Sequence, residues 1–142
     1  MRHIRSLKSR NGRSRRGAAV AEFALIAPVF LTLTVGCIEL GRAVIVQQLL
    51  TNASREGARV AGYDTTSSSS KVSTAVNNYL TSVNISGATT AVSPSPSGLA
   101  DGEQISVTVG IPFSSVSWLP HPFFLGGQTL KATSVMVRQP PP

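Results

Sequence analysis

Cysteine and histidine are almost absent from this sequence, which holds one cysteine, Cys37, and two histidines in 142 residues. A single cysteine excludes an intrachain disulfide. His3 lies in a basic N-terminal stretch, and His121 stands between two prolines with no cysteine or second histidine nearby. Because a zinc site needs several such ligands, we expect no metal, and no sequence motif indicates another cofactor.

The usual signatures of catalysis are missing as well. None of the many serines lies in a nucleophile-elbow sequence, and no glycine-rich phosphate loop is present. Asp101 and Glu103 lie in a turn-forming stretch, where contact with solvent accounts for their charge. The sequence therefore predicts a protein that is not an enzyme.

No acidic residue precedes Glu22 in the sequence. Seven of the 13 basic residues, in contrast, lie at positions 1–17. Beyond Gly17 the chain carries six basic and six acidic residues, so the net charge of +7 belongs to this stretch. It has no aromatic residue to stack on bases, which argues against a nucleic-acid-binding arm. A basic stretch followed at once by an apolar segment is the layout of a targeting leader. We expect residues 1–17 to be that leader and to stay in the cytoplasm.

Charge is also absent from a long apolar run at positions 23–38, and the apolar character begins at position 18. A helix rises about 1.5 Å per residue, so residues 18–38 cover about 30 Å, the thickness of the hydrocarbon core of a bilayer. We expect this segment to cross a membrane once, with Pro28 tolerated as a kink. The hydroxyls of Thr32 and Thr34 are predicted to bond back to the helix backbone.

The helical pattern continues past the apolar run. Glu39 and Arg42 are predicted to mark the water interface of the membrane. Small and apolar residues then recur at three- and four-residue steps, so one helix over residues 18–62 accounts for both segments. Each glycine in it either allows close approach of a neighbouring helix or is simply tolerated in an ordinary core helix. These glycines are Gly36, Gly41 and Gly57.

Glu22 is the exception at the start of the apolar segment, because a carboxylate without a partner in hydrocarbon is costly. A cut between Gly17 and Ala18 would create an α-amino group at the same depth. The carboxylate of one subunit would then pair with the amine of Ala18 in a neighbouring subunit. The same cut would remove the basic leader that holds the segment at the cytoplasmic face.

The same residues carry a resemblance to a known family. A basic leader ending in Gly17, followed by AAVAEF with Glu22 fifth and Phe23 sixth after the cut, resembles the processing site of type IV pilin-like proteins. Residues 15–59 contain EFALIAPVF, then IELGR, then a Gln-containing helix that ends in REGAR. This stretch closely resembles the TadE-like family, the pseudopilins of the tight adherence (Flp) pilus system.

The resemblance implies a minor pilin that a membrane-embedded aspartyl prepilin peptidase cleaves after Gly17, leaving Ala18 as the new N-terminus. It implies that Glu22, with Phe23 beside it, serves processing or subunit assembly. The implied partners are the prepilin peptidase, other pilins packed on the N-terminal helix, and lipid of the bacterial inner membrane. The head that follows the helix is then expected outside the cytoplasm.

Lipid modification is a second interpretation of the N-terminal segment. TVGC at residues 34–37 approaches a lipobox, in which Cys37 would be acylated and everything before it removed. Against it, Thr34 stands where an aliphatic residue is usual, Glu22 interrupts the apolar region, and the sequence after Cys37 continues as helix. The corresponding alternative function is a bitopic or lipid-anchored envelope protein with a small partner-binding head.

Residues 63–138 are predicted to form this head, which gives the chain an α+β fold. A polar stretch precedes a short helix over residues 70–83, with Ser69 or Ser70 as its N-cap. Period-2 alternation predicts an antiparallel sheet of about three strands packed on the short helix. The predicted strands are residues 84–92, 104–113 and 129–139. In the second of them, four alternating residues are predicted to share one face: Ile105, Val107, Val109 and Ile111. Residues 139–142 are expected to be a disordered tail because three prolines cannot extend the sheet.

The connection at residues 114–128 holds a concentration of apolar side chains. Aromatic residues on a loop often act as binding anchors, which makes Trp118, Phe123 and Phe124 a predicted interaction loop. A more common arrangement is an apolar cluster folded over the open end of a small sheet. The sequence leaves both arrangements open.

Overall fold

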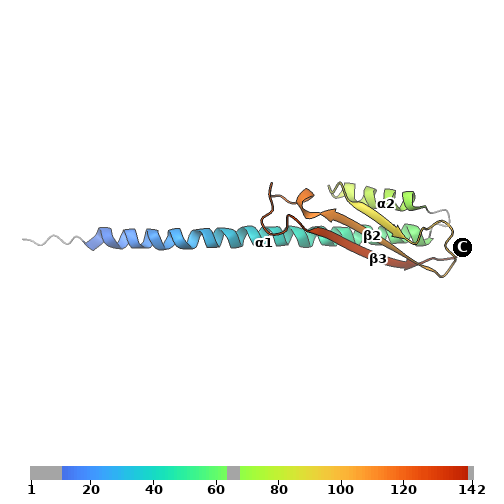
Figure 1. Ribbon diagram of the computed structural model, residues 1–142, viewed down its shortest axis with the longest axis horizontal. Coiled ribbons are helices and arrows are strands. Elements are labelled where there is room, and N and C mark those ends of the chain that lie inside the picture. The colour runs from blue at the N-terminus through green and yellow to red at the C-terminus, as the bar shows by residue number, and fades with distance from the viewer. Residues whose placement is uncertain (1–10, 64–67, 141–142) are drawn as a thin grey trace, which may run out of the picture. The chain divides into compact units, whose positions relative to one another are not determined.

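Within residues 11–63 and 68–140, with side chains from residue 17 onward, the computed structural model of the chain shows two α-helices and a three-stranded sheet (Figure 1). The elements are α1 Asn11–Tyr63, α2 Ser69–Ser82, β1 Thr89–Ser93, β2 Gln104–Pro112 and β3 Thr129–Val137. The predicted α+β class, with a long and a short helix and three antiparallel strands, is confirmed. Parts of the predicted leader, hinge and tail (residues 1–10, 64–67 and 141–142) lie outside the described residues.

The chain divides into two compact units, residues 1–37 and 38–142, and α1 contributes residues to both. In the first unit, nearly all side chains of α1 from residue 17 onward are exposed, and most are apolar. This part of α1 is apolar and long enough to cross a membrane. Thr32 and Thr34 donate to the carbonyls of Pro28 and Phe30, each at 2.8 Å, as the sequence predicted.

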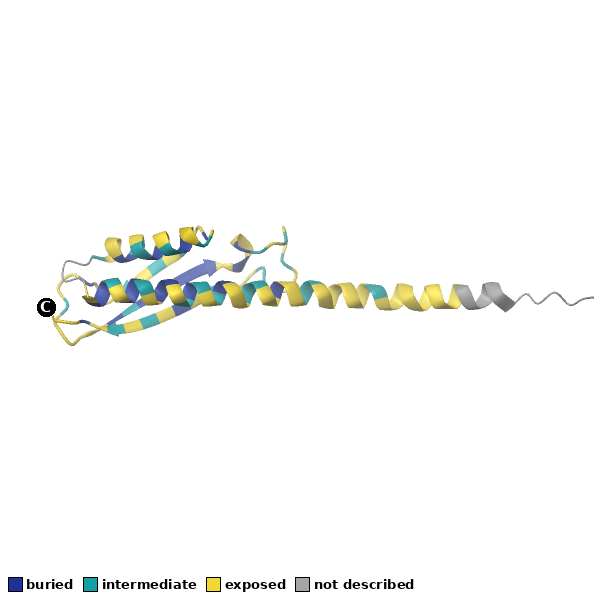
Figure 2. Ribbon diagram, turned by 180° about the vertical axis from the view of Figure 1, so that it is seen from behind, coloured by how far each residue is buried: buried dark blue, intermediate teal, exposed yellow. Residues whose placement is uncertain are grey.

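The second unit, called the head here, has two layers. Strand order is β1-β2-β3, and both pairings are antiparallel. The alternate residues of β2 that the sequence placed on one face are fully buried: Ile105, Val107, Val109 and Ile111. The second half of α1 and all of α2 cover this face, as Figure 2 shows by its buried residues. The opposite face carries exposed residues such as Thr133 and Val135.

The second half of α1 packs on the sheet through the face predicted from its three- and four-residue spacing. Val46, Leu50 and Ala53 are fully buried there. Two polar contacts fix its position along β3. The amide of Gln47 donates to the carbonyl of Lys131 at 2.8 Å, and the hydroxyls of Ser54 and Ser134 lie 2.7 Å apart. The head therefore begins inside α1, at Ile38, because this helix contributes buried residues to its core.

Two local predictions are wrong, and both errors lie at the ends of α2. Its N-cap is Ser68, whose hydroxyl accepts from the backbone N–H of Lys71 at 3.3 Å. At the other end, Asn84 adopts a positive φ of 57° and Ile85 donates its N–H to the carbonyl of Leu80 at 2.9 Å. This is a Schellman cap, so the first residues assigned to a strand instead terminate the helix, and β1 begins only at Thr89.

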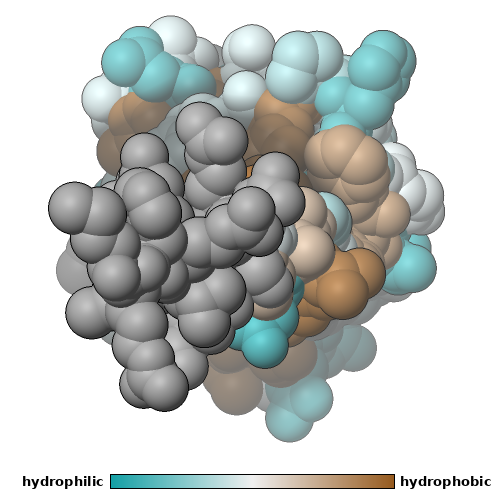
Figure 3. Space-filling view, turned by 90° about the vertical axis from the view of Figure 1, so that its left-hand side faces the viewer, coloured by the Kyte–Doolittle hydropathy of each residue, from teal (hydrophilic) through white to brown (hydrophobic). Residues whose placement is uncertain are grey.

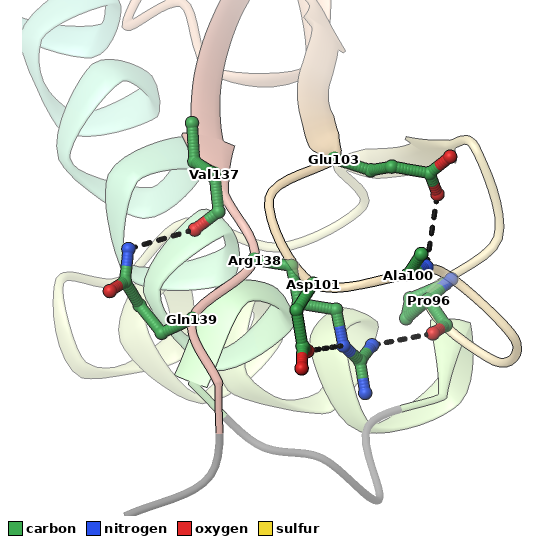
Figure 4. Close-up of polar contacts among 7 residues, drawn as sticks. All are labelled: Pro96, Ala100, Asp101, Glu103, Val137, Arg138 and Gln139. Atoms are coloured by element: carbon green, nitrogen blue, oxygen red, sulfur yellow. Dashed lines mark hydrogen bonds and ion pairs between the residues drawn. The ribbon is translucent and has the colours of Figure 1, made fainter.

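A polar cluster closes one end of the head (Figure 4). The guanidinium of Arg138, which is nearly buried, donates to the carbonyl of Pro96 at 2.8 Å and lies 3.9 Å from the carboxylate of Asp101. Glu103 accepts from the backbone N–H of Ala100 at 3.0 Å. The two carboxylates that the sequence placed in a solvated turn therefore also order the connection between β1 and β2.

Candidate functional site

Glu39 fixes the connection between β2 and β3 to α1. Its side chain is 1% exposed. The carboxylate accepts three backbone hydrogen bonds, from Phe123 to Oε1 at 2.5 Å and from Phe124 and Leu125 to Oε2 at 3.0 and 3.2 Å. Hydrogen bonds of this kind favour the ionised form of a carboxylate and are stronger than bonds between neutral groups. A single α1 side chain thus orders three consecutive loop residues.

Arg42, one turn later on α1, holds the other side of the same connection. Its Nε donates to the carbonyl of Val116 at 2.8 Å. Its guanidinium carbon lies 5.1 Å from the centre of the Trp118 ring, within the range of a cation–π contact. We call residues 116–125 the aromatic loop. The two α1 residues that the sequence assigned to the membrane interface therefore hold the loop that the sequence assigned to binding.

The base of the aromatic loop is built into the core. Phe113, in a short 3-10 helix at Phe113–Ser115, is fully buried, and its N–H donates to the carbonyl of Gln128 at 2.8 Å. Val116 is also buried. The connection between β2 and β3 is consequently closed at its base by the hydrogen bond between Phe113 and Gln128. The aromatic loop above this base is held by Glu39 and Arg42 of α1.

The aromatic side chains of this loop project into solvent. Trp118 is 68% exposed, Phe123 76% and Phe124 59%. The arrangement in which these rings cover the open end of the sheet is therefore wrong. Phe113, which the sequence interpretation did not single out, is buried in the core instead. Viewed from the left-hand side of Figure 1, hydrophobic and hydrophilic residues lie next to each other on the surface (Figure 3).

The residues assigned to processing and assembly lie elsewhere, in the first unit. Gly17, Ala18, Glu22 and Phe23 all lie on α1 and are exposed. A Cβ built on Gly17 would meet no other atom within 4 Å. These four residues are exposed along the helix, and their roles stay predictions.

Other reactive groups form no further site. Cys37 is a free and exposed thiol. Among the residues whose placement is described, no group of three or more His, Cys, Asp or Glu side chains could hold a metal ion. The expectation of no metal therefore stays an expectation.

Comparison with known proteins finds a similarity for α1, the helix that carries both the residues assigned to processing and the two residues that hold the aromatic loop. The family model described as TadE-like protein matches residues 17–59. Residues 17–59 of α1 are thus similar to the TadE-like family. The resemblance predicted over residues 15–59 is thus confirmed over residues 17–59. No curated protein and no solved structure matches the chain significantly.

The TadE-like region covers α1 in both units and ends before α2. It includes IELGR at residues 38–42, the segment that supplies both Glu39 and Arg42. In this chain the two charged residues of that segment bind the aromatic loop, which lies beyond the matched region. Sequence patterns gave no signal for these contacts, because the bonded groups are backbone atoms more than 70 residues away.

Replacing Glu39 with alanine is expected to release the aromatic loop from α1. The N–H groups of residues 123–125 would lose their acceptor, so their hydrogen exchange should accelerate by about tenfold or more, as expected for a locally opened segment. Hydrogen–deuterium exchange of the full chain in detergent measures this directly. Glu39→Gln is the matched variant, since its amide oxygen still accepts, and it should show a smaller acceleration. Equal exchange in the wild type and the alanine variant would contradict the assigned role.

Proposed function

We propose that this protein is a minor pilin of the tight adherence (Flp) pilus, processed by a prepilin peptidase and active in pilus assembly and surface attachment. The observation that carries the proposal is the extent of the TadE-like region, which begins at Gly17 and runs through the exposed apolar part of α1. Gly17 is the residue before the proposed cut. The start of the matched region beside this proposed cut supports the proposed processing site.

The exposed apolar side chains of α1 support a role in both membrane and filament. Large hydrophobic residues exposed at this density are not stable in water and mark a surface for lipid or for other helices. They are Val20, Phe23, Leu25, Ile26, Val29, Phe30, Leu31 and Leu33. Before assembly they contact lipid, and after assembly they pack against the helices of neighbouring pilins.

Glu22 then has a specific partner in the assembled state. Removal of residues 1–17 leaves the α-amino group of Ala18, a cation four residues before Glu22 in the chain. Paired across two subunits, the amine and the carboxylate neutralise each other in a surrounding of low polarity, where an unpaired carboxylate is costly. This pairing favours one axial offset between neighbouring helices.

The basic leader supports the orientation. Positive residues are retained on the cytoplasmic side, so the proposed topology is a single pass through the bacterial inner membrane with the head outside the cytoplasm. The head serves as a structural and binding module without enzymatic activity. Its partners are other pilins, the peptidase and membrane lipid.

Lipid attachment at Cys37 is the competing proposal, and the fold gives it little support. α1 continues without interruption through Cys37 to Tyr63, and Ile38 already belongs to the head. Processing before Cys37 would remove the first half of the TadE-like region. A bitopic protein that keeps its leader would also retain that region but would lack the free amine.

The intact mass and N-terminal sequence of the protein, recovered from membranes of cells that carry its own secretion genes, test the proposal. We expect a chain that begins AAVAEF, which establishes cleavage after Gly17. A lipidated chain that begins at Cys37 would make it a lipoprotein. An uncut chain that retains residues 1–17 would leave a simple membrane anchor, and either result would overturn the proposal.

A further inference from the structure

We propose that the aromatic loop is a second membrane contact of this protein, in which Trp118, Phe123 and Phe124 enter the interfacial layer of the lipid bilayer that α1 crosses. This inference rests on the membrane anchoring in the proposed function. It assigns a lipid partner to the head, whose predicted place is outside the membrane.

The height of the loop along α1 is the first argument. The charge-free run ends at Ile38, and Glu39, the next residue, accepts the backbone N–H groups of Phe123 to Leu125. Arg42, which holds Val116 and Trp118, lies only about 4.5 Å farther along the helix than Glu39. The loop backbone is thus bonded to the residues of α1 that directly follow the apolar run in the sequence.

The chemistry of the loop is the second argument. Tryptophan favours the interface between hydrocarbon and headgroups, because its ring is apolar and its N–H is polar. Phe123 and Phe124 are the apolar complement, and all three aromatic side chains are more than half exposed. Rings exposed to this degree on a small head gain by leaving water.

Charge is the third argument. No acidic residue follows Glu103 in the sequence, so the loop itself carries no negative charge to be repelled by lipid phosphates. The nearest carboxylate, Glu39, is buried and bonded to three N–H groups. The guanidinium of Arg42 over Trp118 adds a positive charge beside the ring, which suits the phosphate layer.

A neighbouring pilin is the other conceivable occupant of this surface. The level of the loop favours lipid, because Glu39 and Arg42 fix it to the first turns of α1 past the apolar run rather than to the far end of the head. Lipid contact also explains why the rings stay exposed while Phe113, at the base of the same connection, is fully buried. The loop would then hold the head at the membrane surface until the subunit is extracted into a filament.

The experiment uses the fluorescence of Trp118, which is the only tryptophan of the chain. The full chain is reconstituted into phosphatidylcholine vesicles, and flotation establishes that it is membrane-bound. Emission is then recorded in ordinary vesicles and in vesicles whose acyl chains are brominated near the headgroup. We expect emission shifted to shorter wavelength, loss of most of the intensity with the brominated lipid, and protection from the aqueous quencher iodide.

Two variants make the test specific. Phe123→Ser combined with Phe124→Ser should weaken quenching by brominated lipid and increase quenching by iodide. Val135→Ser is the matched control, because Val135 is as exposed as Phe124, 59% in each case. It lies next to Ser134, whose partner Ser54 is about 22 Å farther along α1 than Glu39. Its Trp118 signal should equal that of the wild type.

The outcomes separate the two proposals. Flotation with emission typical of water and no quenching by brominated lipid would overturn the loop contact while leaving the membrane anchor intact, and a pilin neighbour would become the occupant. Failure of the chain to float would overturn the anchor and, with it, the loop contact.

Discussion

Replacing Glu22 with alanine is expected to reduce the amount of this protein in sheared pili by about tenfold or more, since an ion pair in a low-polarity surrounding is worth a few kcal/mol and about 1.4 kcal/mol is tenfold. The variant keeps the apolar surface of α1 but loses the group that pairs with the amine of Ala18 in a neighbour. Incorporation is measured by immunoblot of sheared and cell-bound fractions. The leader cleavage state is determined in the same samples, because the resemblance assigns Glu22 to processing or assembly.

The control for this variant is Glu56→Ala, which also removes a carboxylate from α1. Glu56 is bound to Arg59 at 2.6 Å on the helix surface, and exposed pairs of this kind contribute at most about 1 kcal/mol. We expect unchanged pilus content for it, and circular dichroism should show an intact head in both variants. Normal processing and normal pilus content after loss of Glu22 would contradict its proposed role. An envelope protein outside a filament would tolerate that change or insert more readily.

Replacing Gly57 with alanine is expected to destabilise the head by about 1–3 kcal/mol, the usual cost of overpacking a filled core. A Cβ at this position would lie 2.7 Å from Cγ2 of Val76 and 3.0 Å from Cγ1 of Val107. Both valines are fully buried, so neither methyl group has free space to move into. Urea unfolding of the full chain in detergent, followed by circular dichroism, measures the change.

Gly41→Ala is the matched control on the same helix. A Cβ at Gly41 would meet nothing within 4 Å, so the substitution keeps only the gain in helix propensity, up to about 1 kcal/mol. We expect equal or greater stability for it. Equal stability of the Gly57 and wild-type proteins would contradict the close packing of α1 against α2 and β2. Loss of pili in the Gly41 variant with a stable head would instead indicate that a neighbouring helix contacts this position.

Local patterns in the sequence were sufficient for the elements of the fold. The alternation in QISVTVGIP placed β2 within one residue of its observed bounds, and the same four residues that the pattern put on one face form the buried face. The spacing of small and apolar residues likewise gave the packed face of α1. Both succeed because a period of two or of about 3.6 residues is imposed by the backbone itself. The predicted start of β1 was wrong because the C-terminal cap of α2 at Asn84 is defined by hydrogen bonds and not by composition.

The sequence by itself determined the apolar run that ends at Ile38, the isolated Glu22, the basic N-terminal stretch and the TadE-like resemblance, since each is a property of consecutive residues. Only the tertiary structure decided what Glu39 and Arg42 bind. Their partners are backbone atoms of the aromatic loop, and backbone groups leave no mark in a sequence. The structure also decided that Phe113 fills the core while Trp118, Phe123 and Phe124 project outward. All four are aromatic residues within one short stretch, and only the packing of the folded head makes them different.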